Sequence, residues 1–169
     1  MFRIAIAASI IVLLSGCKTV VEQRADSPNQ LVQLGQPINR VIVSYSANGA
    51  DELNENAGFD QNELVKSVKE HLFEKDLYSS SARGGETLEI QITAVRYRST
   101  FNAVMWGVMS GSDNVRGEVY LRDRSGKLLN HFEVYAMYAL GGVAGGWKGE
   151  RWSYLYNKFA DAVTDHLGH

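Results

Sequence analysis

The sequence predicts an α/β (α+β) two-layer sandwich, with two helices on one face of a mainly antiparallel four-stranded sheet. Two kinds of periodicity predict this fold. Four segments alternate apolar and polar residues as strands do, and two segments place apolar residues at spacings of three and four, as amphipathic helices do. The segments follow one another in the order β-α-β-β-β-α, which is typical of a sheet covered by helices.

The first predicted strand is 39–46, where Val41, Val43 and Tyr45 point to one face. A polar, acidic stretch, 47–59, follows it. The order of its oxygen-bearing residues does not match the spacing of an EF-hand calcium loop. We therefore expect a solvated loop at 47–59.

The first predicted helix opens at Asp60, with Glu63 as its reciprocal partner in a capping box. We expect its apolar face to pack on the sheet, and that face comprises Leu64, Val65, Val68, Leu72 and Phe73. A second helix closes the chain, with an apolar stripe formed by Trp152, Leu155, Tyr156, Phe159, Val163 and Leu167.

Three further strands lie between the helices. The strand that begins at Leu88 changes its apolar face near Ala94, which predicts a bulge or an edge twist there. The strands at 115–122 and 131–137 are expected to form a hairpin, because 123–127 has turn composition and Gly126 can adopt a positive φ.

The first seventeen residues predict where in the cell the protein is located. Arg3 precedes the apolar run 4–14, which is about half the roughly 20 residues that a membrane-spanning helix needs. The run is typical of a secretory signal peptide, and it ends in Leu14-Ser15-Gly16-Cys17, which resembles the lipobox of bacterial lipoproteins. A plain signal peptide, a membrane-anchored segment, or a Cys17 thiol that is buried or disulfide-bonded are the alternatives.

The lipobox resemblance implies cleavage before Cys17, a diacylglycerol on its sulfur, and a fatty acyl chain such as palmitate on the new amino group. Several chains hold a protein firmly on a membrane, whereas one chain does so only marginally. Lys18, in place of Asp, resembles the sorting residue of outer-membrane lipoproteins. The resemblance thus implies a protein anchored in the cell envelope, at the outer membrane, with its domain in the periplasm.

Three regions are expected along the chain. Residues 1–16 are the signal peptide, and 38–169 form a single globular α/β domain. Residues 17–37 are polar, contain both prolines of the chain and lack a strand or helix period, so we expect a flexible tether. A fully extended tether of this length would reach about 60–70 Å.

Composition and motifs argue against several functions. The net charge is −2 and no basic patch stands out, so we expect no nucleic-acid binding. The glycine run 141–146 lies where a phosphate-binding loop would, but Trp147 replaces the required lysine, so we expect no nucleotide. We also expect no cofactor and no metal, since no ligand spacing links the histidines His71, His131, His166 and His169.

No GxSxG motif is present in the sequence, and no SxxK motif lies within the predicted domain 38–169. Glu118 and Glu133 lie on neighbouring predicted strands and could face each other, as a carboxylate pair for glycoside hydrolysis would. Pairing with Arg116 and Arg122 explains them more simply, and we expect those pairs. We therefore expect no catalytic residues and a protein that is not an enzyme. A hydrolase of envelope polymers is one alternative, and a small-ligand or lipid carrier with an apolar cavity of several hundred Å³ is another.

The stretch 101–112 is unusually apolar and aromatic for a connection between strands. It is either a covering loop or short helix, or an exposed docking patch, because Trp and Met are enriched at protein interfaces. For the second case, the candidate partner-binding residues are Phe101, Met105, Trp106, Met109 and Trp147.

The second half of the chain carries a further resemblance. The segment Val115–Leu129, followed by the pairs Gly141-Gly142 and Gly145-Gly146 and an amphipathic helix, resembles a family of uncharacterised small α/β bacterial lipoproteins. The family brings no assigned activity, and its fold also resembles envelope accessory domains that bind partner proteins. The resemblance implies a non-catalytic periplasmic binding or scaffold module in an envelope assembly, whose partners are the membrane, through Cys17, and an envelope protein.

Overall fold

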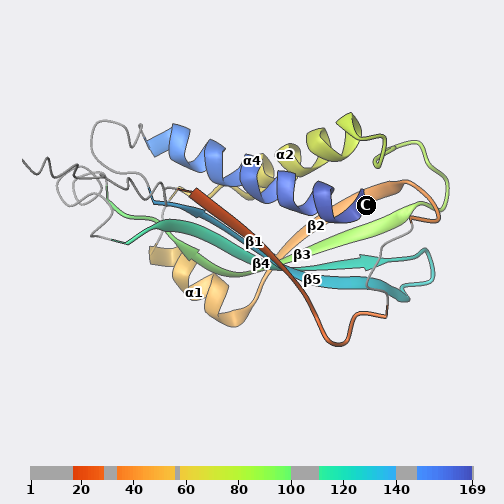
Figure 1. Cartoon of the computed structure of the whole chain (residues 1–169), viewed down its shortest axis with the longest axis horizontal. Helices are drawn as coiled ribbons and strands as arrows, with labels where there is room; N and C mark the ends of the chain where they lie inside the picture. Colours follow the sequence, from red (N-terminus) through yellow and green to blue (C-terminus); the bar gives the residue numbers. More distant parts are fainter. Residues whose placement is uncertain (1–16, 29–33, 56–57, 100–110, 140–147, 169) are drawn as a thin grey trace, which may run out of the picture.

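Strands from both ends of the chain meet in one mixed sheet in the computed structural model, which describes residues 17–28, 34–55, 58–99, 111–139 and 148–168 (Figure 1). The strands are β1 (Cys17–Gln23), β2 (Ile38–Tyr45), β3 (Glu86–Arg96), β4 (Asp113–Arg122) and β5 (Leu128–Tyr138), and the helices are α1 (Ala47–Glu55), α2 (Gln61–Glu74) and α4 (Lys148–Leu167).

The order across the sheet is β1-β5-β4-β3-β2. The pairs β1–β5, β5–β4 and β4–β3 are antiparallel, as predicted for most of the sheet, whereas β2 and β3 are parallel. The chain between β2 and β3 contains α1 and α2, and a helical crossover of this kind allows the second strand to run in the same direction as the first. The expected order β-α-β-β-β-α is therefore incomplete, because it lacks β1 and α1.

The strand β1 occupies residues that we assigned to the tether. It pairs with the outer edge of β5, from Cys17 opposite Tyr138 to Gln23 opposite Phe132. Its Val21 packs against the core. A seven-residue strand with two apolar residues has too weak a period to be recognised locally, and pairing with β5 is what defines it.

The helix α1 occupies residues that we expected to form a loop. Ser46 Oγ accepts a hydrogen bond of 3.1 Å from the Gly49 N–H, which caps the first turn. A Cβ at Gly49 would lie 2.3 Å from the carbonyl oxygen of Ile92, so only glycine allows this approach to β3. Figure 1 shows α1 on the opposite side of the sheet from α2 and α4.

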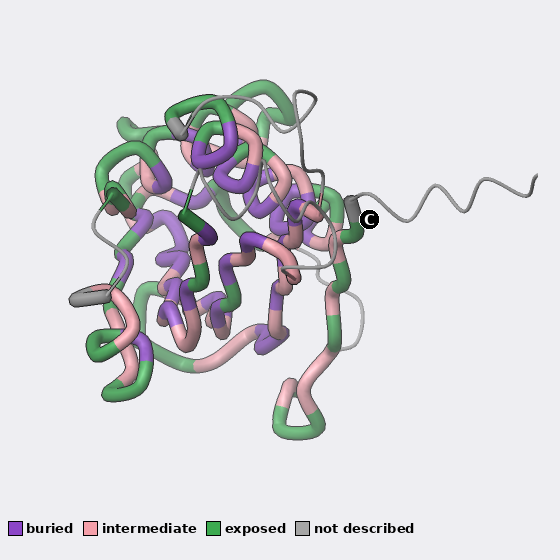
Figure 2. Tube along the Cα trace, turned by 90° about the vertical axis from the view of Figure 1, so that its left-hand side faces the viewer, coloured by how far each residue is buried: buried purple, intermediate pink, exposed green. Residues whose placement is uncertain are grey.

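The core lies between the sheet and the pair α2 and α4, and the burial colours of Figure 2 mark this layer. The predicted N-cap is confirmed at Asp60, whose side chain accepts from the N–H groups of Asn62 and Glu63. The reciprocal half of the capping box is not formed, because the Asp60 N–H donates to Tyr156 Oη and the Glu63 side chain pairs with Lys66. The stripe that we predicted for α4 is buried throughout. It packs closely on β4, where a Cβ at Gly117 would lie 3.2 Å from the Phe159 ring.

The predicted inner face of α2 is correct except at its end. Leu64, Val68 and Leu72 are fully buried, whereas Phe73 is 69% exposed. Each helical residue is rotated by about 100° from the one before it, so Phe73 lies on a different face from Leu72. Two finer predictions are confirmed: the register of β3 shifts between Ile92 and Ala94, and Gly126 has a φ of 85°.

Candidate functional site

The five predicted partner-binding residues lie outside the described residues. They are Phe101, Met105, Trp106, Met109 and Trp147. The described residues on either side, however, show which elements the segments 100–110 and 140–147 connect. The first connects β3 to β4, and the second connects β5 to α4.

Three buried charged residues meet beside the described residues that flank these two segments. Asp113 is fully buried and lies between the side chains of Arg98 and Arg151, which are 2% and 1% exposed. Its Oδ1 lies 3.2 Å from Arg98 Nε, and its Oδ2 lies 2.9 Å from Arg151 Nη1. We call these three residues the Arg98–Asp113–Arg151 cluster.

The cluster also binds backbone carbonyls at the segment ends. Arg98 Nη1 donates to the carbonyl oxygen of Gly111 at 2.7 Å, and Arg98 Nη2 donates to that of Tyr138 at 3.3 Å. Arg151 Nη2 donates to the carbonyl oxygen of Arg98 at 3.2 Å. One buried cluster therefore holds described residues on either side of 100–110 and of 140–147.

Tyr97 completes the surroundings of Arg151. The Arg151 guanidinium carbon lies 4.1 Å from the centre of the Tyr97 ring, and an Arg151 N–H donates to the Tyr97 hydroxyl. Burial raises the pKa of Tyr97, and the two arginines only partly oppose this rise. The phenol is therefore neutral at physiological pH, and it leaves the cluster with two cations and one anion.

This cluster was not predicted from the sequence. Arg98, Asp113 and Arg151 are separated by 15 and 38 residues. Each is an ordinary charged residue in its own neighbourhood, and Asp113 looks like part of a polar turn. The available signal was that Arg98 and Asp113 border the apolar stretch on either side.

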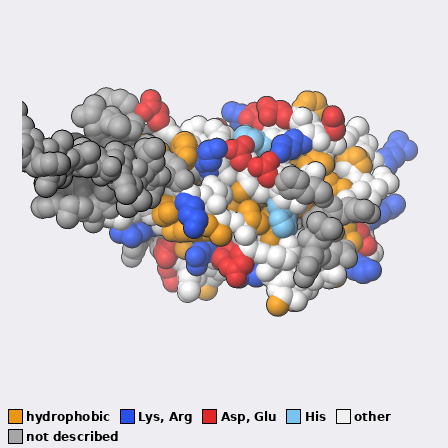
Figure 3. Space-filling model, in the orientation of Figure 1, with side chains coloured by type: hydrophobic (Ala, Val, Ile, Leu, Met, Phe, Trp, Pro, Cys, Tyr) orange, Lys and Arg blue, Asp and Glu red, His pale blue; other side chains and the backbone are white. Residues whose placement is uncertain are grey.

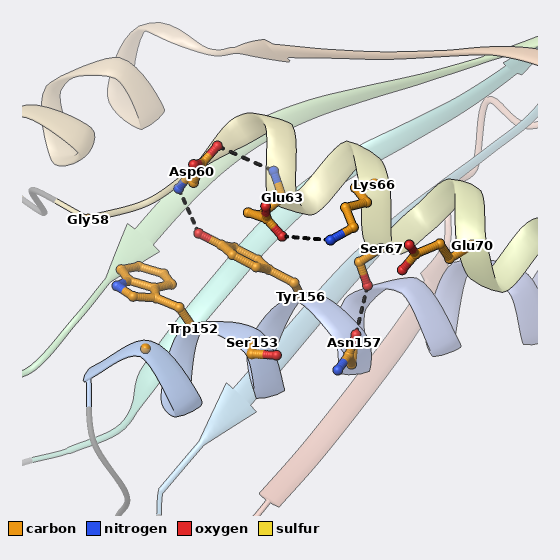
Figure 4. A pocket seen from close by; sticks show the side chains of 11 residues that line it. Gly58, Asp60, Glu63, Lys66, Ser67, Glu70, Trp152, Ser153, Tyr156 and Asn157 are labelled. Atoms are coloured by element: carbon orange, nitrogen blue, oxygen red, sulfur yellow. Dashed lines mark hydrogen bonds and ion pairs between the residues drawn. The ribbon is translucent and has the colours of Figure 1, made fainter.

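A groove of about 440 Å³ runs between α2 and α4 (Figure 4). The Asp60 N–H donates to Tyr156 Oη at 2.7 Å, and Ser67 Oγ donates to Asn157 Oδ1 at 2.9 Å, so both contacts join the two helices. Burial raises the pKa of Tyr156 to about 12. The lining includes charged residues of α2, such as Glu63, which is unlike the mainly apolar lining of a typical lipid or drug-like ligand site.

The two glutamates that we considered as a catalytic pair do lie opposite each other, on β4 and β5. Arg24, which follows β1, neutralises both: its Nε lies 2.9 Å from Glu118 Oε2 and its Nη2 lies 3.0 Å from Glu133 Oε1. Burial alone would raise the pKa of Glu118, but the hydrogen bond and charge of Arg24 and the charge of His131 lower it overall. Glu118 is therefore a poor general acid near neutral pH.

Of the two arginines that we expected to pair with Glu118 and Glu133, one does so. Arg116 lies 3.6 Å from Glu133, as predicted. Arg122 instead pairs with Glu89 on β3, at 2.9 Å, because β3 lies on the other side of β4 from β5.

The histidines of the described segments lie apart. His71 contacts Asp161, His131 lies between Asp26 and Glu118, and His166 packs on Phe132. Within the described ranges, no group of three or more His, Cys, Asp or Glu side chains is arranged to hold a metal ion.

The described part of the face seen in Figure 3 carries side chains of both charge signs. Figure 3 shows Lys and Arg side chains among Asp and Glu side chains, with smaller groups of hydrophobic side chains between them. Among the helices that the structure describes, none has the length and apolar character needed to cross a membrane.

These features define a small mixed α+β domain whose buried charges are structural. Residues 20–142 match the model of a family described as a domain of unknown function (DUF4410), and the chain belongs to that family. No curated protein matches the chain.

The chain is similar to solved structures. A PelC dodecamer from Paraburkholderia phytofirmans, in a form with one substituted residue, is similar over 90% of this chain and 100% of its own, with a TM-score of 0.50 and 13% identity. A minor lipoprotein from Acinetobacter baumannii matches over 78% of this chain and 93% of its own, with a TM-score of 0.41 and 13% identity. At this identity the Paraburkholderia structure supports the fold alone.

Proposed function

We propose that this protein is a lipid-anchored envelope lipoprotein, at the outer membrane with its domain in the periplasm, that acts as a non-catalytic binding or scaffold module. The anchor is inferred from the lipobox Leu14-Ser15-Gly16-Cys17. The observation that carries the binding role is the Arg98–Asp113–Arg151 cluster, because it gathers the ends of two segments at one place.

Those two segments contain the five candidate partner-binding residues. Aromatic residues and Met are enriched in protein interfaces, and a few such residues carry most of the binding energy. Binding loops are commonly held by a rigid scaffold. A buried ionic cluster at the segment ends is a scaffold of this kind.

The hydrolase alternative has weaker support. The opposed Glu118 and Glu133 share Arg24 as a cationic partner, and a glycoside hydrolase needs one carboxylic acid that remains protonated. The groove between α2 and α4 has charged side chains of α2 in its lining, beside Trp152 and Tyr156 of α4, which also weakens the lipid-carrier alternative. We therefore propose a protein that is not an enzyme.

Photocrosslinking in the native host tests the binding role. A photoreactive residue at Trp106 or Trp147 is expected to capture a specific envelope protein. The same residue at Ser125, in the exposed β4–β5 turn, is the control and should not capture it. Combined replacement of Met105, Trp106 and Met109 by Ser should abolish capture at Trp147, and an unchanged set of captured proteins would refute the proposal.

Mass spectrometry of the mature protein tests the anchor. We expect an N-terminal peptide that begins at Cys17 and carries three acyl chains, and we expect Cys17→Ala to be released from the membrane fraction. A mature peptide that retains Met1, or an unmodified thiol at position 17, would contradict the anchor.

A further inference from the structure

We propose that the domain sits directly on the bilayer that holds its anchor, with Lys18, Arg96 and Arg116 facing anionic headgroups. The inference rests on the proposed acylation of Cys17 and adds an orientation to it. It replaces the expected long tether with direct contact.

Because β1 begins at Cys17, the expected tether does not separate the acylated residue from the folded domain. Cys17 is itself the first residue of β1 and is paired with Tyr138 of β5. Paired strands lie about 5 Å apart, so no free chain separates the acylated residue from the sheet. The end of the sheet at Cys17, Tyr138 and Asp113, which we call the Cys17 end, must then lie within a few ångströms of the headgroups.

Basic residues occupy the rows of the sheet nearest this end. Lys18 is paired with Met137, Met137 with Asn114, and Asn114 with Arg96, so one row has a cation at each side. The three charged side chains are exposed: they belong to Lys18, Arg96 and Arg116.

Arg116 lies in a row slightly further from the lipid. It is paired with Tyr135, which is paired with Val20. The Arg116 guanidinium lies 4.8 Å from the centre of the Tyr135 ring, and Val20 is 36% exposed. Exposed basic and apolar side chains beside the half-buried ring of Tyr135 suit the boundary between headgroups and acyl chains.

The acidic row comes next. Glu22 is paired with Glu133, and Glu133 with Glu118. A strand rises about 3.3 Å per residue, so the row of Glu22 lies roughly 17 Å from Cys17 along the strand. The row of Arg116 lies about 10 Å from Cys17, and the row of Lys18 about 3 Å. Since charges are screened over about 8 Å at physiological salt, the bilayer senses the cations more strongly than the glutamates.

Other acidic residues near this end favour a tilt. Glu150 is exposed at the start of α4, and Asp51 is exposed on α1, which packs beside β3. Repulsion of these carboxylates should turn the edge formed by β1 and β5 toward anionic lipid. Basic residues near a membrane surface are attracted to anionic lipid.

Fluorescence quenching tests the orientation. The purified lipidated protein is placed in vesicles that contain phosphatidylglycerol and a lipid with a nitroxide on its headgroup, and a fluorophore is attached at Ser112→Cys or Ser125→Cys. Ser112 precedes β4 at the Cys17 end, whereas Ser125 lies about 33 Å away, beyond the other end of β4. We expect quenching several-fold stronger at 112 than at 125, and equal quenching would overturn the proposal.

Two variants separate the causes. Insertion of about twelve Gly and Ser residues between Cys17 and Lys18 should reduce quenching at 112 to the level at 125, because it restores a tether. The double variant Lys18→Gln, Arg116→Gln should reduce the quenching at 112 partly. The control is Lys66→Gln with Lys75→Gln, which changes an exposed residue of α2 and its exposed C-cap, and it should leave the quenching unchanged. If neither the insertion nor the charge variant changes the quenching at 112, the proposed orientation on the bilayer is wrong.

Failure of the anchor gives a different result. A protein without acyl chains, identified by mass spectrometry, would not stay on the vesicles at all. An acylated protein that stays bound but shows equal quenching at both labels refutes only the orientation. No other protein is present, so a strong signal at 112 cannot be due to an envelope partner.

Discussion

Arg98 and Arg151 share the single carboxylate of Asp113, and all three side chains are almost fully buried. Removing charges from water costs several kcal/mol per ion, and the cost is recovered only when each charge keeps its partners. The carboxylate of Asp113 also accepts from the Arg98 backbone N–H at 2.7 Å. Loss of this one anion would leave two buried cations facing each other.

We predict that Asp113→Asn lowers the free energy of unfolding by about 3–5 kcal/mol, because the side chain keeps its size and loses its charge. Urea unfolding of the domain without its lipid would measure the loss. The control is Asp165→Asn, whose carboxylate is 62% exposed and pairs with Lys75, and we expect it to cost under about 1 kcal/mol. Equal effects of the two variants would show that the cluster is not a structural centre.

At the scale of one element, α2 separates what an apolar pattern predicts well from what it predicts poorly. Its N-terminal cap and three of its inward residues were predicted correctly, because capping and helical spacing are local properties. Phe73 was assigned to the inner face and is exposed. The width of a helical stripe depends on what covers it, and α4 covers only part of this surface.

We predict that Leu72→Ala costs about 2–5 kcal/mol of unfolding free energy, because it opens a cavity in the core. The neighbouring variant Phe73→Ala should change the same quantity by no more than about 0.5 kcal/mol. Chemical denaturation of both variants makes the comparison. A large loss for Phe73→Ala would mean that its ring is covered in the folded protein.

For the whole molecule, β1 forms one edge of the sheet, and its residues are more than 100 positions away in sequence from their partners in β5. Its attachment depends on Arg24, which pairs with Glu118 and Glu133. The folded pKa of Glu118 lies below the ordinary value of 4.5. The stabilising effect of this carboxylate is thus fully present above pH 4.5 and is lost as the pH falls through the folded value.

We predict that acid releases β1 before it unfolds the centre of the sheet. Amide hydrogen exchange at Val20 and Val21 should speed up below pH 4.5, after correction for the intrinsic rate, while Ile90 and Val119 stay protected. Glu118→Gln should show the faster exchange already at neutral pH. Glu89→Gln, which removes a partner of Arg122 and does not touch β1, should not. Simultaneous loss of protection in β1 and β3 would contradict the prediction.

Much of the fold could be predicted from local patterns. Strands β2 to β5, helices α2 and α4, the bulge near Ala94 and the turn at Gly126 each have a period or a turn residue that is visible in the sequence. The helix α1 could not be predicted in the same way, since its glycine and polar residues favour a loop unless Gly49 meets the β3 backbone. The opposition of Glu118 and Glu133 was foreseen, but their shared partner Arg24 was not.

The sequence alone determined which segments form most of the sheet and its helical cover, because period, caps and turns act over a few residues. It also contains the lipobox from which the anchor is inferred. Only the tertiary structure decided that Cys17–Gln23 is a strand and that Arg98, Asp113 and Arg151 share one buried site. The reason is physical: hydrogen bonding at a sheet edge and burial of charge depend on partners that are distant in sequence, and no local pattern records them.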